Sequence, residues 1–131
     1  MRILLDTHIL LWLLTTPERL APPVRDAILD PANEILFSAA SVWEIAIKTG
    51  LRRPDFTPDP AAVAEEARDL GFVELAIDSR IAARVADLPP IHRDPFDRLL
   101  VAQAIAEPAL FYTADARLSG YSELVRHVAG R

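Results

Sequence analysis

The chain has 131 residues, with 14 Lys and Arg against 19 Asp and Glu, which gives a formal net charge of −5 at pH 7. Hydrophobic residues make up 51% and charged residues 25% of the sequence, which excludes intrinsic disorder as the main state. The negative charge argues against a general polyanion-binding surface, and the lack of cysteine excludes disulfide scaffolds, thiolate metal sites and a cysteine nucleophile. We expect a single domain spanning residues 1–131.

Strands and helices alternate along the predicted secondary structure. Short, mainly apolar segments predict strands at 2–5, 34–37, 72–77, 109–113 and 125–128. Helical spacing, prolines in first turns and glycines after last turns predict helices at 8–15, 22–29, 41–49, 60–70, 79–86 and 95–106. This alternation favours an α/β fold around a mostly parallel sheet, in which ligands bind beyond the carboxyl ends of the strands.

No segment of the sequence predicts a membrane span or a secretory signal. The clean apolar run at 9–14 has only six residues, whereas a membrane-spanning helix needs roughly 18 or more. We therefore expect a soluble protein of the cytoplasm that does not associate with a membrane.

Four acidic side chains are candidates for a site at the carboxyl edge of the predicted sheet. Asp6 follows the first strand and Glu44 lies past the second, while Asp97 stands at a helix start and Asp115 follows the fourth strand. If these carboxylates converge, their repulsion raises some of their pKa values unless a cation neutralises them. Oxygen ligands suit hard cations such as Mg²⁺ or Mn²⁺. A carboxylate-bound metal pair is a common device for hydrolysing phosphodiester bonds.

Three of these acids also have structural explanations that the sequence leaves open. Asp6 stands at a strand-to-helix turn, where an aspartate makes a good helix N-cap. Glu44 has capping-box spacing from Ser41 and lies four residues before Lys48, so a cap or a helical ion pair would account for it. Asp115 fits a turn or cap position.

Two aspartates compete at the start of the helix predicted at 95–106. Asp94 precedes Pro95 and is a strong N-cap candidate, which is the role that we favour for it. Asp97 lies one turn further on, where backbone N–H groups and the helix dipole favour an anion. It is either an ordinary first-turn acid or a side chain directed into the crevice that the helix borders.

Four stretches of the chain, in this order, resemble the PIN-domain ribonucleases, and specifically the VapC-type toxins of bacterial toxin–antitoxin pairs. They are LLDTHILLWLL at 4–14, SAASVWEIAIKTGLR at 38–52, HRDPFDRLLVAQA at 92–104 and YTADARLSGY at 112–121. No single stretch is decisive, but the four in order make a specific signal.

The resemblance implies a metal site made by Asp6, Glu44, Asp97 and Asp115, with Mg²⁺ or Mn²⁺ as the cofactor. Its Asp-x-x-Leu-x-Ala register favours Asp97 over Asp94 as the third acid. It also implies a three-layer α/β/α sandwich with a five-stranded, mostly parallel sheet. The implied function is that of an endoribonuclease toxin that cleaves RNA, forms homodimers and is blocked by a small antitoxin protein.

Basic residues near the acids are candidates for contacts with RNA phosphates. Lys48, Arg52 and Arg53 follow Glu44 closely, and Arg93 and Arg98 bracket the third acid. A solvated helix face is the alternative explanation, and for Arg53 we favour that explanation. The predicted phosphate contacts are therefore Lys48, Arg52, Arg93 and Arg98.

Polar residues beside the acids complete the candidate site. Thr7, Ser38 and Thr113 could orient a ligand water or a carboxylate, although helix capping and strand-end hydrogen bonds would explain them equally well. His8 and His92 could contact phosphate or assist protonation. A lone histidine beside an acid is more often structural, and no histidine spacing in the sequence fits a zinc motif.

The two tryptophans, Trp12 and Trp43, lie on the apolar sides of their predicted helices. We expect both side chains in the hydrophobic core and not as platforms for stacked bases.

Three other functions compete with the nuclease hypothesis. A response-regulator receiver needs a lysine late in the chain, but Lys48 is the only lysine. A haloacid-dehalogenase-like phosphatase needs a second aspartate two residues after the first, where this chain has His8. A catalytically idle PIN-like binding module is the remaining alternative, and the presence of all four expected acids weighs against it.

Overall fold

The computed structural model describes residues 1–51 and 58–128, and its centre is a five-stranded sheet. The strands are β1 (Arg2–Leu5), β2 (Glu34–Ser38), β3 (Val73–Leu75), β4 (Leu110–Thr113) and β5 (Val125–His127). They are arranged in the order β3-β2-β1-β4-β5, and all four pairings are parallel. The predicted parallel sheet is confirmed, and every strand contributes its carboxyl end to the same edge.

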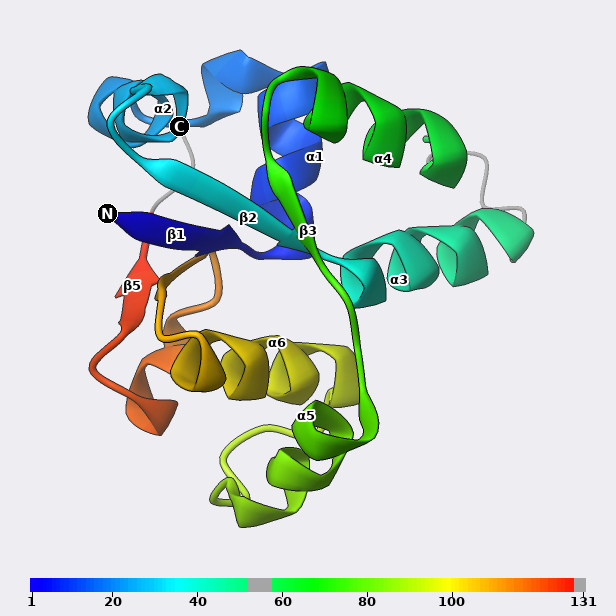
Figure 1. Cartoon of the computed structure of the whole chain (residues 1–131), viewed down its shortest axis with the longest axis vertical. Helices are drawn as coiled ribbons and strands as arrows, with labels where there is room; N and C mark the ends of the chain where they lie inside the picture. The colour runs from blue at the N-terminus through cyan, green and yellow to red at the C-terminus, as the bar shows by residue number, and fades with distance from the viewer. Residues whose placement is uncertain (52–57, 129–131) are drawn as a thin grey trace.

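Helices cover both faces of the sheet (Figure 1). They are α1 (Thr7–Thr15), α2 (Pro22–Leu29), α3 (Ala39–Gly50), α4 (Pro60–Asp69), α5 (Ser79–Arg84) and α6 (Pro95–Ala106). Short 3-10 turns lie at Pro17–Arg19, Val85–Asp87 and Ala116–Tyr121. None of the helices in the described parts of the chain has both the length and the apolar character needed to cross a bilayer.

Side-chain alternation along the central strands divides the core in two. Ile3 and Phe37 pack on the face covered by α1, α2 and α4. Leu4, Leu36 and Phe111 pack on the opposite face, against α6. Because successive strand residues point to opposite faces, a strand buried on both sides must be apolar at nearly every position. This pattern confirms the α/β/α sandwich.

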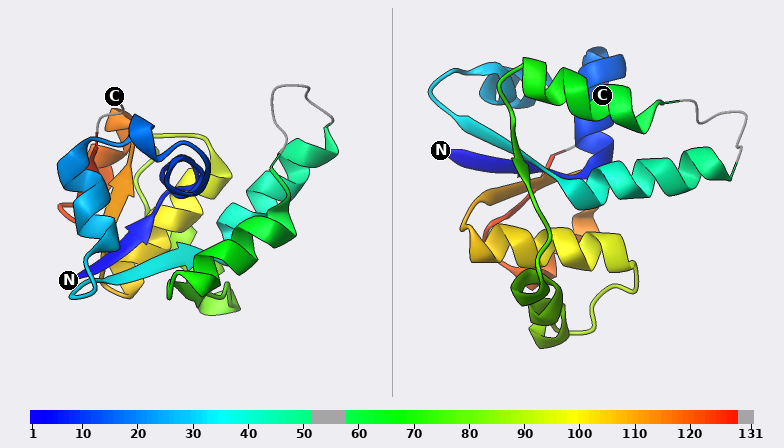
Figure 2. Two further views of the ribbon diagram at one scale, coloured as in Figure 1. Left: turned by 90° about the horizontal axis from the view of Figure 1, so that it is seen from above. Right: turned by 45° about the vertical axis from the view of Figure 1, so that its right-hand side comes forward.

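The α3 helix begins two residues earlier than the sequence predicts. Ser38, the last residue of β2, caps it by accepting a hydrogen bond from the backbone N–H of Ala40 at 3.0 Å. Ser41 therefore lies inside the helix and is fully buried, so its predicted capping box with Glu44 is wrong. The helix runs out beyond the sheet with α4 alongside it, as the two views in Figure 2 show.

The prediction that both tryptophans lie in the core is wrong for Trp43, whose exposed fraction is 61%. Its ring meets the edge of the Phe96 ring, with the two centroids 5.2 Å apart. Trp12 is partly buried against the core, and the guanidinium of Arg19 lies 4.3 Å from its ring centroid. Helical periodicity identifies an apolar face, but it does not say whether another element of the same chain covers it.

Gly71 ends the turn between α4 and β3 with a φ of +89°, a conformation that side chains with a Cβ rarely adopt. Gly71→Ala is expected to lower the free energy of unfolding by about 1 kcal/mol. Gly50→Ala is the matched control, because Gly50 is helical and nothing lies within 4 Å of a Cβ built there. The control should be neutral or stabilise by up to about 1 kcal/mol. Urea unfolding of both variants tests the difference, and equal effects would contradict it.

Candidate metal centre

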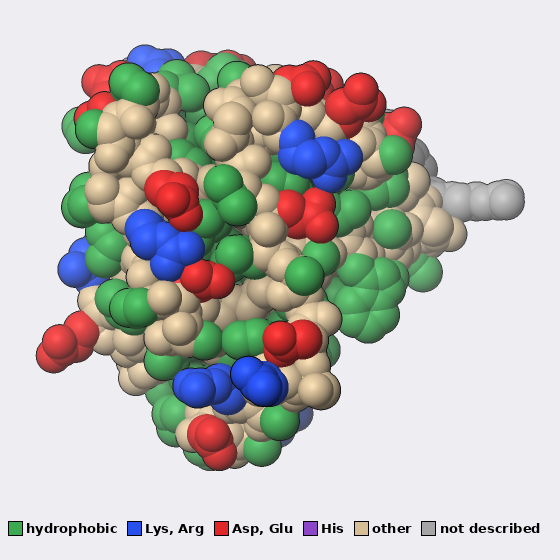
Figure 3. Space-filling view, viewed as in Figure 1, with side chains coloured by type: hydrophobic (Ala, Val, Ile, Leu, Met, Phe, Trp, Pro, Cys, Tyr) green, Lys and Arg blue, Asp and Glu red, His purple; other side chains and the backbone are tan. Residues whose placement is uncertain are grey.

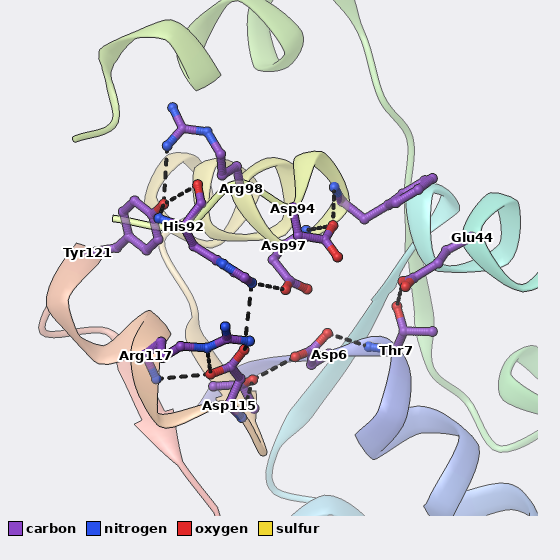
Figure 4. A network of polar contacts seen from close by, with 12 residues as sticks. Asp6, Thr7, Glu44, His92, Asp94, Asp97, Arg98, Asp115, Arg117 and Tyr121 are labelled. Carbon is purple, nitrogen blue, oxygen red and sulfur yellow. Dashed lines mark hydrogen bonds and ion pairs between the residues drawn. The ribbon is translucent and has the colours of Figure 1, made fainter. Parts of the chain in front are cut away.

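A cavity of about 530 Å³ opens at the carboxyl edge of the sheet, and all four predicted acids line it. Asp6 enters it from the end of β1 and Glu44 from α3, while Asp97 comes from α6 and Asp115 from the segment after β4. Figure 4 shows Asp6, Asp97 and Asp115 pointing toward one another. The parallel topology thus brings together carboxylates that lie up to 109 positions apart in the sequence.

Asp6 serves both as a helix cap and as part of the cavity wall. Its Oδ1 accepts a hydrogen bond from the Thr7 backbone N–H at 2.7 Å, and its Oδ2 accepts one from Thr113 Oγ1 at 2.6 Å. The side chain is buried, and burial raises the pKa of Asp6 although these two hydrogen bonds oppose the shift. The cap and the site, which the sequence presents as alternatives, are therefore two uses of one carboxylate.

Glu44 is buried at the cavity wall with both of its oxygens engaged. Thr7 Oγ1 donates to Oε1 at 2.7 Å and lies 2.9 Å from Ser41 Oγ. Lys48 Nζ lies 3.0 Å from Oε2, which confirms the expected helical ion pair. This ion pair also brings the only lysine of the chain to the cavity.

Asp94 and Asp97 differ in their contacts at the start of α6. Asp94 Oδ1 accepts hydrogen bonds from the backbone N–H groups of Phe96 and Asp97, at 2.8 and 3.2 Å, so Asp94 is confirmed as the cap of α6. Burial, followed by the charges of Asp6, Asp94, Glu44 and Asp115, raises the pKa of Asp97 to about 8. Burial and the neighbouring negative charges therefore both disfavour the ionised form of Asp97.

Asp115 begins the 3-10 turn after β4 and is held by Arg117. The guanidinium donates from Nε to Oδ1 at 3.0 Å and from Nη2 to Oδ2 at 2.8 Å. These hydrogen bonds from Arg117 lower the pKa of Asp115. Arg117 also lines the cavity, and the sequence analysis did not identify it. Its position two residues after an acidic cap was the signal available, because in an Asx turn the carboxylate accepts from the backbone N–H two residues on, here that of Arg117 at 3.0 Å.

His92 lies directly at the acids. Its Nε2 is 3.1 Å from Asp97 Oδ2 and 3.7 Å from Asp115 Oδ2. The hydroxyl oxygen of Tyr121 accepts a hydrogen bond from the His92 backbone N–H at 2.8 Å. His8 and His127 line the same cavity, and His127, which the sequence gave no reason to select, has its Nε2 3.2 Å from the carbonyl oxygen of Ala114.

The predicted phosphate contacts occupy different places in the structure. Lys48 lines the cavity, and it also lines, with the exposed Arg93, an adjoining hollow of about 390 Å³. Arg98 points away from the acids (Figure 4), and its guanidinium donates to the carbonyl oxygens of Pro89 at 2.9 Å and Val85 at 3.0 Å. The expectation of a phosphate contact at Arg98 thus finds no support in its geometry. Arg52 lies outside the described residues.

The three hydroxyl residues chosen from the sequence behave in two ways. Thr7 and Thr113 donate to the carboxylates of Glu44 and Asp6, which is the contact with a carboxylate that the sequence left open for them. Ser38 instead donates to Gln103 Oε1 at 2.5 Å and joins β2 to α6. The two threonines therefore fix the carboxylates from behind, on the side away from the cavity.

The oxygen chemistry of the cavity suits a hard divalent cation, and within residues 1–51 and 58–128 the ligand atoms that all lie within 4.8 Å of one another belong to His92, Asp94 and Asp97. The donor set of the cavity consists of carboxylate oxygens from four segments, with two threonine hydroxyls holding two of them in place. Such a set suits Mg²⁺ or Mn²⁺ better than metals that prefer thiolates. The raised pKa of Asp97 indicates charge that a cation would neutralise.

Comparisons with known proteins show the family and the fold of the chain. The PIN domain model matches residues 3–124. Ribonuclease VapC22 of Mycobacterium tuberculosis is 31% identical over 124 residues, which cover 91% of each chain. A crystal structure of VapBC2 from Rickettsia felis, bound to a DNA fragment from their promoter, superposes with a TM-score of 0.68 at 14% identity, covering 98% of this chain and 99% of that one. From the family match and the 31% identical relative, the chain belongs to the PIN domain family.

Proposed function

We propose that this protein is a metal-dependent endoribonuclease, the toxin of a toxin–antitoxin pair, which hydrolyses RNA phosphodiester bonds with Mg²⁺ or Mn²⁺. The observation that carries the proposal is the convergence of Asp6, Glu44, Asp97 and Asp115 in one cavity, with the pKa of Asp97 raised to about 8. Membership of the PIN domain family and the similarity to a ribonuclease support it.

Asp6, Asp97 and Asp115 would be the main metal ligands, with Glu44 acting directly or through water. A bound divalent cation would supply an activated water at neutral pH and neutralise charge on the phosphate. Thr113 holds the Asp6 carboxylate in place, since it donates to Oδ2 at 2.6 Å. The resemblance implies products with 5′-phosphate and 3′-hydroxyl ends.

Three basic side chains are the proposed phosphate contacts within the described residues. Lys48 and Arg117 line the acidic cavity, and Arg93 lines the adjoining hollow. Arg117 is a contact that the sequence does not indicate, whereas the Arg98 guanidinium is bound to backbone carbonyls and is not among the proposed contacts. An RNA strand that crosses the cavity would meet these cations while its scissile phosphate faces the acids.

RNA cleavage by the purified full chain tests the proposal. We expect cleavage with Mg²⁺ or Mn²⁺, loss of cleavage in excess EDTA, and recovery when the metal is restored. Cleavage that persists in EDTA would contradict the metal mechanism. Binding of RNA without cleavage under all metal conditions would favour the alternative of an idle PIN-like binding module.

A small antitoxin protein and a second copy of the chain are the proposed protein partners, and the cytoplasm is the proposed location. The antitoxin would cover the acidic cavity and so block access of RNA. Co-expression with the product of a short reading frame directly upstream should abolish cleavage by the wild-type chain. A toxin that remains fully active in a stable complex with that product would contradict this assignment.

We propose that an apolar surface on α3 and α6 is the contact between two copies. It consists of Trp43, Ile47, Leu51 and Phe96, and the first three have exposed side chains. Figure 3 shows hydrophobic side chains gathered over α3, while acidic and basic side chains are interspersed elsewhere on that face. Exposed contiguous apolar surface of this kind marks protein interfaces more often than free surface.

Trp43→Glu is expected to convert a wild-type dimer into a monomer, because a carboxylate in an apolar interface loses its hydration without gaining a partner. Light scattering coupled to size-exclusion chromatography measures the mass. Leu29→Glu is the matched control, since Leu29 is similarly exposed but lies on α2. A variant at Trp43 that remains dimeric, or a wild-type chain that is monomeric, would contradict the interface.

A further inference from the structure

His92 lies in the loop just before α6, and its ring contacts two of the proposed metal ligands. Its Nε2 lies 3.1 Å from Asp97 Oδ2 and 3.7 Å from Asp115 Oδ2. One ligand atom each from His92, Asp94 and Asp97 can be chosen so that all three lie within 4.8 Å of one another. The side chain is only 15% exposed, so the imidazole is a fixed part of the wall.

The loop that carries His92 is held in place by a network behind the site. Tyr121 Oη accepts a hydrogen bond from the His92 backbone N–H at 2.8 Å and lies 3.2 Å from the His92 carbonyl oxygen. Arg98 donates to Tyr121 Oη at 3.1 Å and to the carbonyl oxygens of Pro89 and Val85 (Figure 4 shows the contact with Tyr121). This network explains why Arg98 points away from the acids, and it orients the imidazole toward them.

The distance between His92 Nε2 and Asp97 Oδ2 is one that two ligands of the same cation adopt. Neighbouring ligands that lie about 2.1 Å from an octahedral ion are about 3.0 Å apart. The separation of 3.1 Å between His92 and Asp97 matches this value, and the 3.7 Å to Asp115 requires only a small side-chain movement. The same separation also fits a hydrogen bond, so the two roles must be distinguished by experiment.

We infer that His92 supplies a nitrogen ligand to the cation held by Asp97 and Asp115, and that this nitrogen makes the site prefer Mn²⁺ to Mg²⁺. Mg²⁺ keeps oxygen ligands and water and dehydrates reluctantly, so replacing one of these oxygens by a nitrogen costs Mg²⁺ more binding than it costs Mn²⁺. The inference rests on the proposed function only in requiring a divalent cation at these acids.

Electron spin-echo spectroscopy of Mn²⁺ bound to the metal-free full chain detects a directly bound nitrogen by its modulation of the echo. We expect this modulation in the wild-type chain and its loss in His92→Gln. The glutamine retains an N–H that can donate a hydrogen bond to Asp97. If His92 only made a hydrogen bond to Asp97, the glutamine would therefore take over its role. His8→Gln and His127→Gln are the matched controls, because both histidines line the same cavity, and both variants should keep the modulation.

Calorimetric titration with Mn²⁺ alone and with Mg²⁺ alone provides the second readout. His92→Gln should weaken Mn²⁺ binding by roughly tenfold or more and Mg²⁺ binding by much less, so that the ratio of the two affinities falls.

Bound Mn²⁺ without nitrogen modulation in the wild-type chain, or modulation that survives in His92→Gln, would overturn this inference and leave the nuclease proposal standing. A wild-type chain that binds neither cation would overturn both. If His92→Gln does not fold, modulation that persists in the His8→Gln and His127→Gln double variant supports the assignment, and its loss there overturns it.

Discussion

Asp6→Asn is expected to lower RNA cleavage by at least about 100-fold, because it removes a charged ligand from the cation site, and loss of residues that merely support ligands already costs 10–100-fold. The fold should survive. Asparagine offers an oxygen to the Thr7 N–H and an amide N–H to Thr113 Oγ1, so both contacts can remain hydrogen bonds, the second with its direction reversed. Cleavage rates at saturating Mg²⁺ and Mn²⁺ measure the loss.

The same substitution should leave the metal-free protein at least as stable as the wild type. Burial raises the pKa of Asp6, which means that the folded state disfavours its charge, and asparagine carries none. Thermal unfolding in EDTA tests this expectation. A strongly destabilised variant would mean that the loss of activity reports misfolding, and a variant as active as the wild type would refute the role of Asp6.

Two other aspartates provide matched controls for the Asp6 experiment. Asp59 caps α4 by accepting from the Ala61 N–H at 3.0 Å, and Asp59→Asn should leave both activity and stability unchanged. Asp94→Asn should be milder than Asp6→Asn, because asparagine caps a helix nearly as well as aspartate. If Asp94→Asn were inactive and Asp97→Asn active, the assignment of the third acid would be reversed.

The stability of the metal-free protein is expected to fall as the pH rises from about 4 to about 8. Asp97 has a pKa of about 8 in the folded chain and 3.8 as its ordinary value, which applies to the unfolded chain. Between these two values the folded state holds a proton that the unfolded state has released, so raising the pH favours unfolding. The contribution of Asp97 to the stability of the folded state is complete below the pKa of Asp97 in the unfolded chain. It is lost as the pH rises through the pKa of Asp97 in the folded chain.

Asp97→Asn removes this contribution, so the variant should gain stability relative to the wild type as the pH approaches 8. Melting temperatures in EDTA between pH 5 and pH 9 measure the difference, which should reach several degrees at the upper end. Saturating Mn²⁺ should raise the melting temperature of the wild type more at pH 8 than at pH 6 and should have little effect on the variant. Asp59→Asn should follow the wild type, and a pH-independent difference between Asp97→Asn and wild type would contradict the raised pKa.

The element boundaries show how far local sequence signals reach. The helix predicted at 95–106 is α6 at Pro95–Ala106, because Asp94 and Pro95 are a cap and a first-turn residue whose effects act within one helical turn. The sequence predicts the start of α3 two residues too late. Ser38 is both the last residue of β2 and the cap of α3, and the strand pattern around it does not indicate a cap. Capping and periodicity are set by residues a few positions apart, so the sequence expresses them directly.

The positions of the candidate acids along the chain could also be predicted from the sequence, but the residues that they contact could not. Asp6 and Asp115 follow strands, and the rule that parallel strands end at one edge predicts that they converge. The hydrogen bond between Thr113 and Asp6 joins residues 107 positions apart. Whether such a pair meets depends on the strand order β3-β2-β1-β4-β5, which puts β4 beside β1.

By itself, the sequence of this protein determined the alternation of strands and helices, the cap of α6 and the four candidate acids, all of which depend on local patterns or on a resemblance in those patterns. Only the tertiary structure decided that Trp43 is exposed, that Arg98 binds loop carbonyls and that His92 and Arg117 stand at the acids. Burial, charge repulsion and hydrogen bonding between distant residues depend on which elements pack together. That packing is a property of the whole core and has no signature in any single segment.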